Sequence, residues 1–342
     1  MYKHGGDIYS HKNMLDFSAN INPLGTPAAV IEAACNGVKE AAHYPDPLCQ
    51  ELIQAIAAHE KVEQEQIICG NGAAELIFSL CLALKPKKAL LLAPSFHEYE
   101  QALQTVDCEI RYHYLKEAEG FHLQTAYLNA LTDDLDIVFL CNPNNPTGIL
   151  TENDLLLKIL ERCREKDIFF VLDECFNDFL DDPEAHTMKD RLHCFPNLFI
   201  LKAFTKIYAM AGLRLGFGFT ANEALLHKMK CCTQPWSVSI PAQKAGIAAV
   251  KEQAYVKTAL NLIKEERAYL RVALKEAGFT VYDSAANYLF FQGPPSLYGD
   301  CLKKRIMIRD CGNYEGLRQG FYRIVVRLHD DNIELIEALN IE

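Results

Sequence analysis

The sequence predicts an α/β protein in which a mostly parallel sheet, covered by helices on both faces, precedes a smaller α+β lobe. From about residue 66, short and almost wholly apolar runs alternate with amphipathic stretches, which is typical of strands buried on both faces. After Pro241 the pattern changes to long helical stretches followed by further strand candidates. The chain has 342 residues, more than one average domain, so we expect two lobes.

The strands and helices of the first lobe follow from the spacing of apolar residues. The expected strands are residues 67–69, 89–92, 137–140, 168–172, 198–201 and 213–219. The expected helices are residues 73–84, 97–105 and 151–166. Thr151 is the expected N-cap of the last helix, because Asp154 follows three residues later.

The last hundred residues predict the smaller lobe. Helical spacing continues to about Ala277, strand candidates follow at 288–291, 306–309 and 322–326, and a last helix starts at Asn332. The segment before the first helix is loop-like and fits either lobe. We therefore expect an N-terminal active-site segment (1–25), a large cofactor-binding domain (26–240) and a small C-terminal domain (241–342).

The composition argues against several classes of protein. A net charge of -11 is unsuited to binding nucleic acid, which needs a basic surface. Residues 1–13 are polar and resemble no signal peptide, and no apolar run approaches the roughly 20 residues that span a bilayer. The 13 cysteines include no C-x-x-C pair, which favours reduced thiols over disulfides or a metal site. We expect a cytoplasmic protein that binds neither membrane nor metal.

A glycine turn follows the first expected strand. Residues 70–75 read Gly-Asn-Gly-Ala-Ala-Glu and open a helix, where backbone amides can bind a phosphate group. A dinucleotide fingerprint would have glycine in place of Glu75 and an acidic residue after the next strand, where Ala93 stands. The turn therefore disfavours NAD; a simple tight turn is the alternative.

Polar side chains follow two more strands. Residues 142–148 read Asn-Pro-Asn-Asn-Pro-Thr-Gly, whose prolines fix the backbone and leave the Asn145 amide free to bind a ligand. Asp173 ends the most apolar strand, where a carboxylate is costly unless it pairs with a cation such as a protonated pyridine. A rigid turn and a helix cap are the respective alternatives.

Cationic side chains complete the pattern. Lys206 precedes the apolar stretch 207–219, in which Arg214 is the only charge. A lysine in a dry pocket loses its proton readily and forms a Schiff base with an aldehyde. Arg214 suits a phosphate group, and Arg309 with Arg323 suits a substrate that has two anionic groups. A solvated lysine and exposed arginines are the alternatives.

In this order, the motifs resemble the fold-type I aminotransferase superfamily of pyridoxal-phosphate enzymes over nearly the whole chain. Several further segments are similar to the threonine-phosphate decarboxylase family, which is related to histidinol-phosphate aminotransferases and serves cobalamin synthesis. These segments are residues 4–6 (His-Gly-Gly), 16–25 (Asp-Phe-Ser-Ala-Asn-Ile-Asn-Pro-Leu-Gly), 44–46 (Tyr-Pro-Asp), 235–238 (Pro-Trp-Ser-Val) and 308–314 (Ile-Arg-Asp-Cys-Gly-Asn-Tyr).

The resemblance implies a homodimer that binds pyridoxal 5'-phosphate and a small phosphorylated amino acid. The implied reaction is decarboxylation of L-threonine O-3-phosphate to (R)-1-aminopropan-2-yl phosphate. Decarboxylation of O-phospho-L-serine to ethanolamine phosphate and transamination of the histidinol-phosphate type are the alternatives. A pyridoxal-phosphate-binding regulator without activity is a further alternative, disfavoured because every position expected to do chemistry is filled.

The resemblance also assigns roles to residues. Lys206 would bind the cofactor aldehyde, Asp173 would keep the pyridine nitrogen protonated, and Asn145 would hydrogen-bond the ring hydroxyl. The other cofactor-binding residues would be Gly72, Ala73, Ala74, Phe96, Thr205 and Arg214, with Tyr44 from a second subunit. The substrate-binding residues would be His4, Gly5, Asn20, Asn145, Arg309 and Arg323.

Three positions depart from the usual pattern of aminotransferases. Ala203 and Ala74 each lack a hydroxyl group that commonly reaches the cofactor phosphate, at a cost of about 1 kcal/mol for each lost hydrogen bond. Phe176 stands where aminotransferases commonly have tyrosine, and this favours the decarboxylase family.

Overall fold

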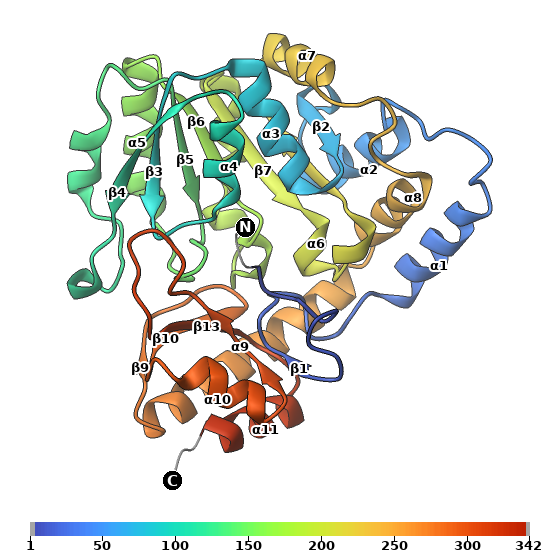
Figure 1. Ribbon diagram of the computed structural model, residues 1–342. Helices are drawn as coiled ribbons and strands as arrows, with labels where there is room; N and C mark the ends of the chain where they lie inside the picture. The colour runs from blue at the N-terminus through green and yellow to red at the C-terminus, as the bar shows by residue number, and fades with distance from the viewer. Residues whose placement is uncertain (1–3, 340–342) are drawn as a thin grey trace.

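The large lobe is built on a seven-stranded sheet that is parallel except at one side (Figure 1). The computed structural model describes residues 4–339. Strands β3 to β7 run parallel to one another, whereas β8 is antiparallel to both of its neighbours. In spatial order the strands are β2 (Ile67–Gly70), β8 (Gly216–Phe219), β7 (Leu198–Ala203), β6 (Phe169–Asp173), β5 (Ile137–Cys141), β3 (Lys88–Ala93) and β4 (Glu109–Tyr114).

The prediction of a mostly parallel α/β sheet is confirmed. The central strands β5, β6 and β7 are buried along almost their whole length, as their apolar sequences require. Strand β4 was missing from the prediction because it lies at the edge of the sheet. Its sequence, Glu-Ile-Arg-Tyr-His-Tyr, is half polar and every residue is at least partly exposed, so it lacks an apolar run.

Three helices of the large lobe begin close to the expected positions: α3 (Gly72–Leu84), α4 (Glu98–Gln104) and α5 (Asn153–Glu165). Helix α7 (Glu223–Cys232) was missing from the prediction. The expected N-cap of α5 is wrong: Glu152 occupies that position. The backbone N–H of Thr151 instead donates to the side-chain oxygen of Asn142, 2.7 Å away, so Thr151 is held in the preceding loop.

The small lobe contains an antiparallel sheet in the order β12 (Arg309–Asp310), β13 (Phe321–Val325), β10 (Tyr288–Gln292) and β9 (Thr280–Val281). The strand expected at 306–309 is divided. Its first half, β11 (Ile306–Met307), pairs with β1 (Leu15–Asp16) near the N-terminus, and its second half is β12. Helices α10 (Leu297–Lys303) and α11 (His329–Leu339) complete the lobe.

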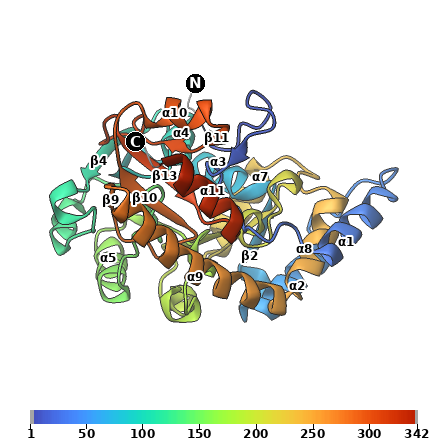
Figure 2. The same ribbon diagram turned by 90° about the horizontal axis from the view of Figure 1, so that it is seen from below.

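Two segments join the lobes. The long helix α9 (Gln253–Glu276) runs from the large lobe to the small sheet (Figure 2). The N-terminal segment pairs through β1 with the small lobe, whereas the backbone N–H of Asn22 donates to the carbonyl of Lys206 in the large lobe, 3.1 Å away. This segment therefore crosses the gap between the two sheets.

The remaining helices pack beside the large sheet. Helices α1 (Ala28–Val38) and α2 (Gln50–Glu60) contact α8 (Ile240–Ala249), which lies across the expected boundary at residue 240. The three expected segments stay a prediction, and residues 1–3 and 340–342 lie outside the described part of the chain. None of the described helices is long and apolar enough to cross a membrane.

Candidate active site

A cavity of about 250 Å³ lies where the carboxyl ends of the large sheet, the N-terminal segment and the small sheet meet. It contains all but two of the residues predicted from the sequence to form a site; Gly72 and Tyr44 do not line it. The predicted residues that do are His4, Gly5, Asn20, Ala73, Ala74, Phe96, Asn145, Asp173, Thr205, Lys206, Arg214, Arg309 and Arg323.

Lys206 has the only ammonium group that lines this cavity within residues 4–339. It lies on the short helix α6 (Phe204–Ile207), directly after strand β7. Burial, followed by the positive charge of Arg323, lowers the pKa of Lys206 to about 8. The amine is therefore much closer to deprotonation at neutral pH than a solvated lysine, which suits attack on an aldehyde.

Asp173 reaches the cavity from the last position of β6, with only 4% of its surface exposed. The hydroxyl of Tyr99 donates to one carboxylate oxygen at 2.5 Å, and the backbone N–H of Cys175 donates to the other at 2.9 Å. Burial raises the pKa of Asp173 above its ordinary value. A cationic ring nitrogen would offset this cost of burying the carboxylate.

The glycine turn and Arg214 form one anion-binding feature. No side chain caps the N-terminus of α3, so its first amides are open to a ligand. The guanidinium of Arg214 lies against this turn: a Cβ added to Gly72 would be 2.4 Å from Nη2. Gly72 also has a φ of +79°, a conformation that favours glycine. Both features fit a phosphate group.

Arg323 and Arg309 face each other on neighbouring strands of the small sheet, each only 5% exposed. Arg323 donates from Nη1 to the side-chain oxygen of Asn145 and from Nη2 to the carbonyl of Ser18, 2.9 Å away. Within residues 4–339, no carboxylate lies within ion-pair distance of the Arg323 guanidinium, and its Nε has no partner. A buried cation of this kind favours an anionic ligand.

The N-terminal segment closes one side of the cavity. Gly5 packs so tightly that an added Cβ would lie 2.1 Å from the carbonyl of Ser18. The next residue, Gly6, donates its N–H to the Ser18 hydroxyl at 2.7 Å. Asn20 is 2% exposed and its side-chain oxygen has no partner in the described structure. This segment therefore offers polar groups to a ligand.

A family model described as "Aminotransferase class I and II" matches residues 12–339. The chain belongs to this family. It is 40% identical to the threonine-phosphate decarboxylase of Salmonella typhimurium, with 98% of this chain and 95% of that protein covered.

Further comparisons with this aminotransferase-family chain cover nearly all of its residues. It is 29% identical to an adenosylcobalamin biosynthesis bifunctional protein of Leptospira interrogans, covering 99% of this chain and 41% of that protein. The structure of the histidinol-phosphate aminotransferase from Clostridium acetobutylicum superposes with a TM-score of 0.89 and 32% identity, covering 95% of this chain and 98% of the other. The predicted fold-type I class is thereby confirmed.

Tyr44 lies apart from the cavity in this family member. Its ring is 78% exposed and stacks on the half-exposed ring of Trp236, with centroids 4.5 Å apart. Gly72 lies behind Arg214 rather than on the cavity wall. The expected contact of Tyr44 with a second subunit stays a prediction.

Several side chains of the site were not predicted from the sequence. Glu98 and Tyr314 line the cavity, and Tyr99 hydrogen-bonds Asp173. Glu98 and Tyr99 begin α4, shortly after the carboxyl end of β3. The rule that ligands bind beyond the carboxyl ends of strands indicates this segment too.

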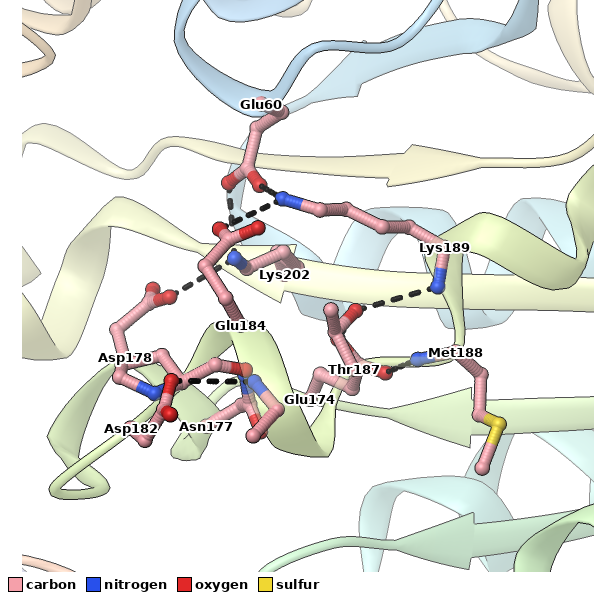
Figure 3. Close-up of polar contacts among 12 residues, drawn as sticks. Glu60, Glu174, Asn177, Asp178, Asp182, Glu184, Thr187, Met188, Lys189 and Lys202 are labelled. Carbon is pink, nitrogen blue, oxygen red and sulfur yellow. Dashed lines mark hydrogen bonds and ion pairs between the residues drawn. The ribbon is translucent and has the colours of Figure 1, made fainter. Parts of the chain in front are cut away.

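A network of buried charges lies behind the site (Figure 3). Lys202 of β7 contacts Glu60 and Asp178, each at 2.8 Å, and Lys189 contacts Glu60 at 3.3 Å. Glu174 follows Asp173 and accepts a hydrogen bond from the Thr187 hydroxyl at 2.7 Å. This network ties together the ends of the two strands that lead to Asp173 and Lys206.

Proposed function

We propose that this chain is a pyridoxal-5'-phosphate-dependent carboxy-lyase that converts L-threonine O-3-phosphate to (R)-1-aminopropan-2-yl phosphate and CO2 for cobalamin biosynthesis. One observation carries the proposal: Arg323 and Arg309, both buried, share a cavity with an amine whose pKa is about 8. Two guanidinium groups suit a substrate with a carboxylate and a phosphate. The names of the relatives from Salmonella typhimurium and Leptospira interrogans support the reaction and the pathway.

The residues of the cavity fit pyridoxal phosphate. The first amides of α3, Thr205 and Arg214 would hold its phosphate, and Asp173 would hold its pyridine nitrogen. Asn145 would hydrogen-bond the ring hydroxyl and Lys206 would bind the aldehyde. When bound, the group supplies a conjugated electron sink for the bond that breaks at the substrate α-carbon.

The chain itself decides which bond at the α-carbon is aligned for cleavage. Arg323 would hold the α-carboxylate, while Arg309, Asn20 and the His4–Gly5 segment would hold the substrate phosphate. Phe176 is 5% exposed and lines the cavity where aminotransferases commonly have tyrosine. Its apolar ring supplies no hydroxyl group on that side, which supports decarboxylation over transamination.

The assay separates the candidate reactions by their products. The purified holoenzyme is given phosphothreonine, phosphoserine or histidinol phosphate with 2-oxoglutarate, and CO2 and oxo products are measured, with Lys206→Ala as the blank. We expect CO2 from phosphothreonine. For phosphoserine we expect kcat/KM to be about 10- to 200-fold lower, since one methyl group contributes about 1–3 kcal/mol. Oxo product from histidinol phosphate without CO2 from either amino acid would refute the proposal.

We also propose that the enzyme is a cytoplasmic homodimer in which Tyr44 reaches the partner's cofactor. The exposed Tyr44–Trp236 stack supports this, because large aromatic rings are seldom left exposed together. Sedimentation of the wild type should give a dimer. The Tyr44→Phe variant should remain dimeric but retain pyridoxal phosphate less tightly; unchanged retention would contradict the role of Tyr44.

A further inference from the structure

Glu98 brings a carboxyl group into the cavity that none of the roles above uses. It is the first residue of α4, and its Oε1 lies 3.4 Å from Nδ1 of His4 on the N-terminal segment. Its Oε2 is buried and has no hydrogen-bond partner among residues 4–339. An unsatisfied buried carboxyl oxygen at a ligand cavity is costly unless a ligand or a proton occupies it.

Near neutral pH the side chain of Glu98 is present in both its ionised and its protonated form. Burial is the main cause that raises its pKa to about 7, partly opposed by the positive charges of Lys206 and Arg309. Burial, followed by Arg309, lowers the pKa of both His4 and His97, so both imidazoles are neutral at pH 7. The titratable and charged groups around Glu98 are His4, His97, Asp173, Lys206, Arg309, Tyr314 and Arg323.

We propose that Glu98 binds a proton when the phosphorylated substrate enters, and that the neutral carboxyl then donates a hydrogen bond to the anion held by Arg309. This inference rests on the proposed function. An ionised carboxylate only accepts hydrogen bonds and repels a phosphate dianion, whereas the neutral acid is a donor. Glu98 is therefore a substrate-binding residue that favours a phosphorylated substrate and links its binding to proton uptake.

The direction of the pH dependence follows from this linkage. Above pH 7 the free carboxyl is mostly ionised, so phosphate binding must draw a proton from solution and weakens as the pH rises. For a group with a pKa of about 7, the dissociation constant should rise about fivefold between pH 7 and 8 and about tenfold between pH 8 and 9. A glutamine cannot ionise, so the Glu98→Gln variant should lack this slope.

The test measures protons rather than turnover. The holoenzyme is titrated calorimetrically with isopropyl phosphate, which has no amine to react with the cofactor, in buffers of different ionisation enthalpy from pH 7 to 9. At pH 8 the wild type should take up roughly 0.9 proton more than Glu98→Gln. Glu100→Gln is the matched control: Glu100 lies on the same helix but contacts Gln104 at the surface, so its proton uptake should equal that of the wild type.

Other outcomes decide against the inference. Equal proton uptake by the wild type and Glu98→Gln would overturn it, as would uptake that disappears in His4→Asn but persists in Glu98→Gln. The CO2 assay keeps the two proposals apart. Release of CO2 without a Glu98-dependent proton refutes only the role of Glu98, whereas a wild type that neither releases CO2 nor binds isopropyl phosphate refutes both.

Discussion

Removing the ammonium group of Lys202 should destabilise the protein far more than removing an exposed one. Lys202 is 5% exposed and lies 2.8 Å from carboxylate oxygens of both Glu60 and Asp178 (Figure 3). Methionine has a similar length without the charge. In Lys202→Met the buried carboxylate of Glu60 therefore loses its nearer cationic partner and keeps only the contact with Lys189 at 3.3 Å among those described. Breaking a buried ion pair in this way costs about 3–5 kcal/mol of unfolding free energy.

The matched control is Lys264→Met. Lys264 contacts Asp181 at 2.7 Å, but both side chains are more than half exposed. Water and salt screen such a pair, so we expect a loss below about 1 kcal/mol. The free energy of unfolding is measured by urea denaturation of both variants and the wild type at one fixed cofactor concentration.

The pH dependence gives an independent check. Burial opposes ionisation of Glu60, but the charge and hydrogen bond of Lys202 and the charge of Lys189 outweigh it, so the pKa of Glu60 lies below its ordinary value. Its contribution to stability is present above the unfolded pKa of about 4.5 and is lost as the pH falls through the lower folded value. The penalty of Lys202→Met should therefore shrink in acid. Equal losses for the two Lys→Met variants at neutral pH would refute the reasoning.

Two further predictions concern cofactor binding. Gly72→Ala should weaken retention of pyridoxal phosphate on dialysis, because the new methyl group would lie 2.4 Å from Nη2 of Arg214, whereas Gly212→Ala, with open space around it, should behave like the wild type. Only the neutral amine of Lys206 reacts with the cofactor aldehyde. The rate at which the apoprotein binds pyridoxal phosphate should therefore rise about tenfold per pH unit up to about pH 8 and then level off. Stopped-flow absorbance measures this rate, and a rate independent of pH would contradict the prediction.

Strand ends explain why so much of the site was predictable. Asp173 ends a buried apolar strand, Lys206 and Asn145 each follow one, and the carboxyl ends of parallel strands meet at one edge of a sheet. The central strands are also the most apolar segments, so their order and burial follow from local sequence. The sequence predicted that Arg309 and Arg323 bind the same substrate. It did not predict that they lie opposite each other on paired strands, because β12 has just two residues.

Contacts between distant segments explain what the sequence did not predict. The strand expected at 306–309 divides because β11 pairs with β1, almost 300 residues away, and no local pattern encodes that pairing. Threonine is a common N-cap residue, but the backbone N–H of Thr151 donates to the side-chain oxygen of Asn142, and this contact holds Thr151 in the loop before the helix. From the sequence alone, Glu98 is an ordinary acidic residue in the first turn of a surface helix. In the structure the N-terminal segment packs against it, with Nδ1 of His4 3.4 Å from its Oε1, and no local pattern predicts this contact.

Charged side chains lie on both sides of the carboxyl ends of β6 and β7. The partners of these side chains differ between the two sides and indicate where an anion binds. Asp173 and Glu174 are adjacent, yet the first contacts Tyr99 in the cavity and the second contacts Thr187 in the network behind it. In that network, the buried ammonium group of Lys202 has carboxylate partners within the chain. On the cavity side, the hydrogen-bond partners of the buried Arg323 guanidinium in the described part of the chain are an amide oxygen and a carbonyl oxygen. Since an uncompensated buried charge costs several kcal/mol, we expect a ligand to supply the counter-ion of Arg323, as the doubly anionic amino acid proposed above would do.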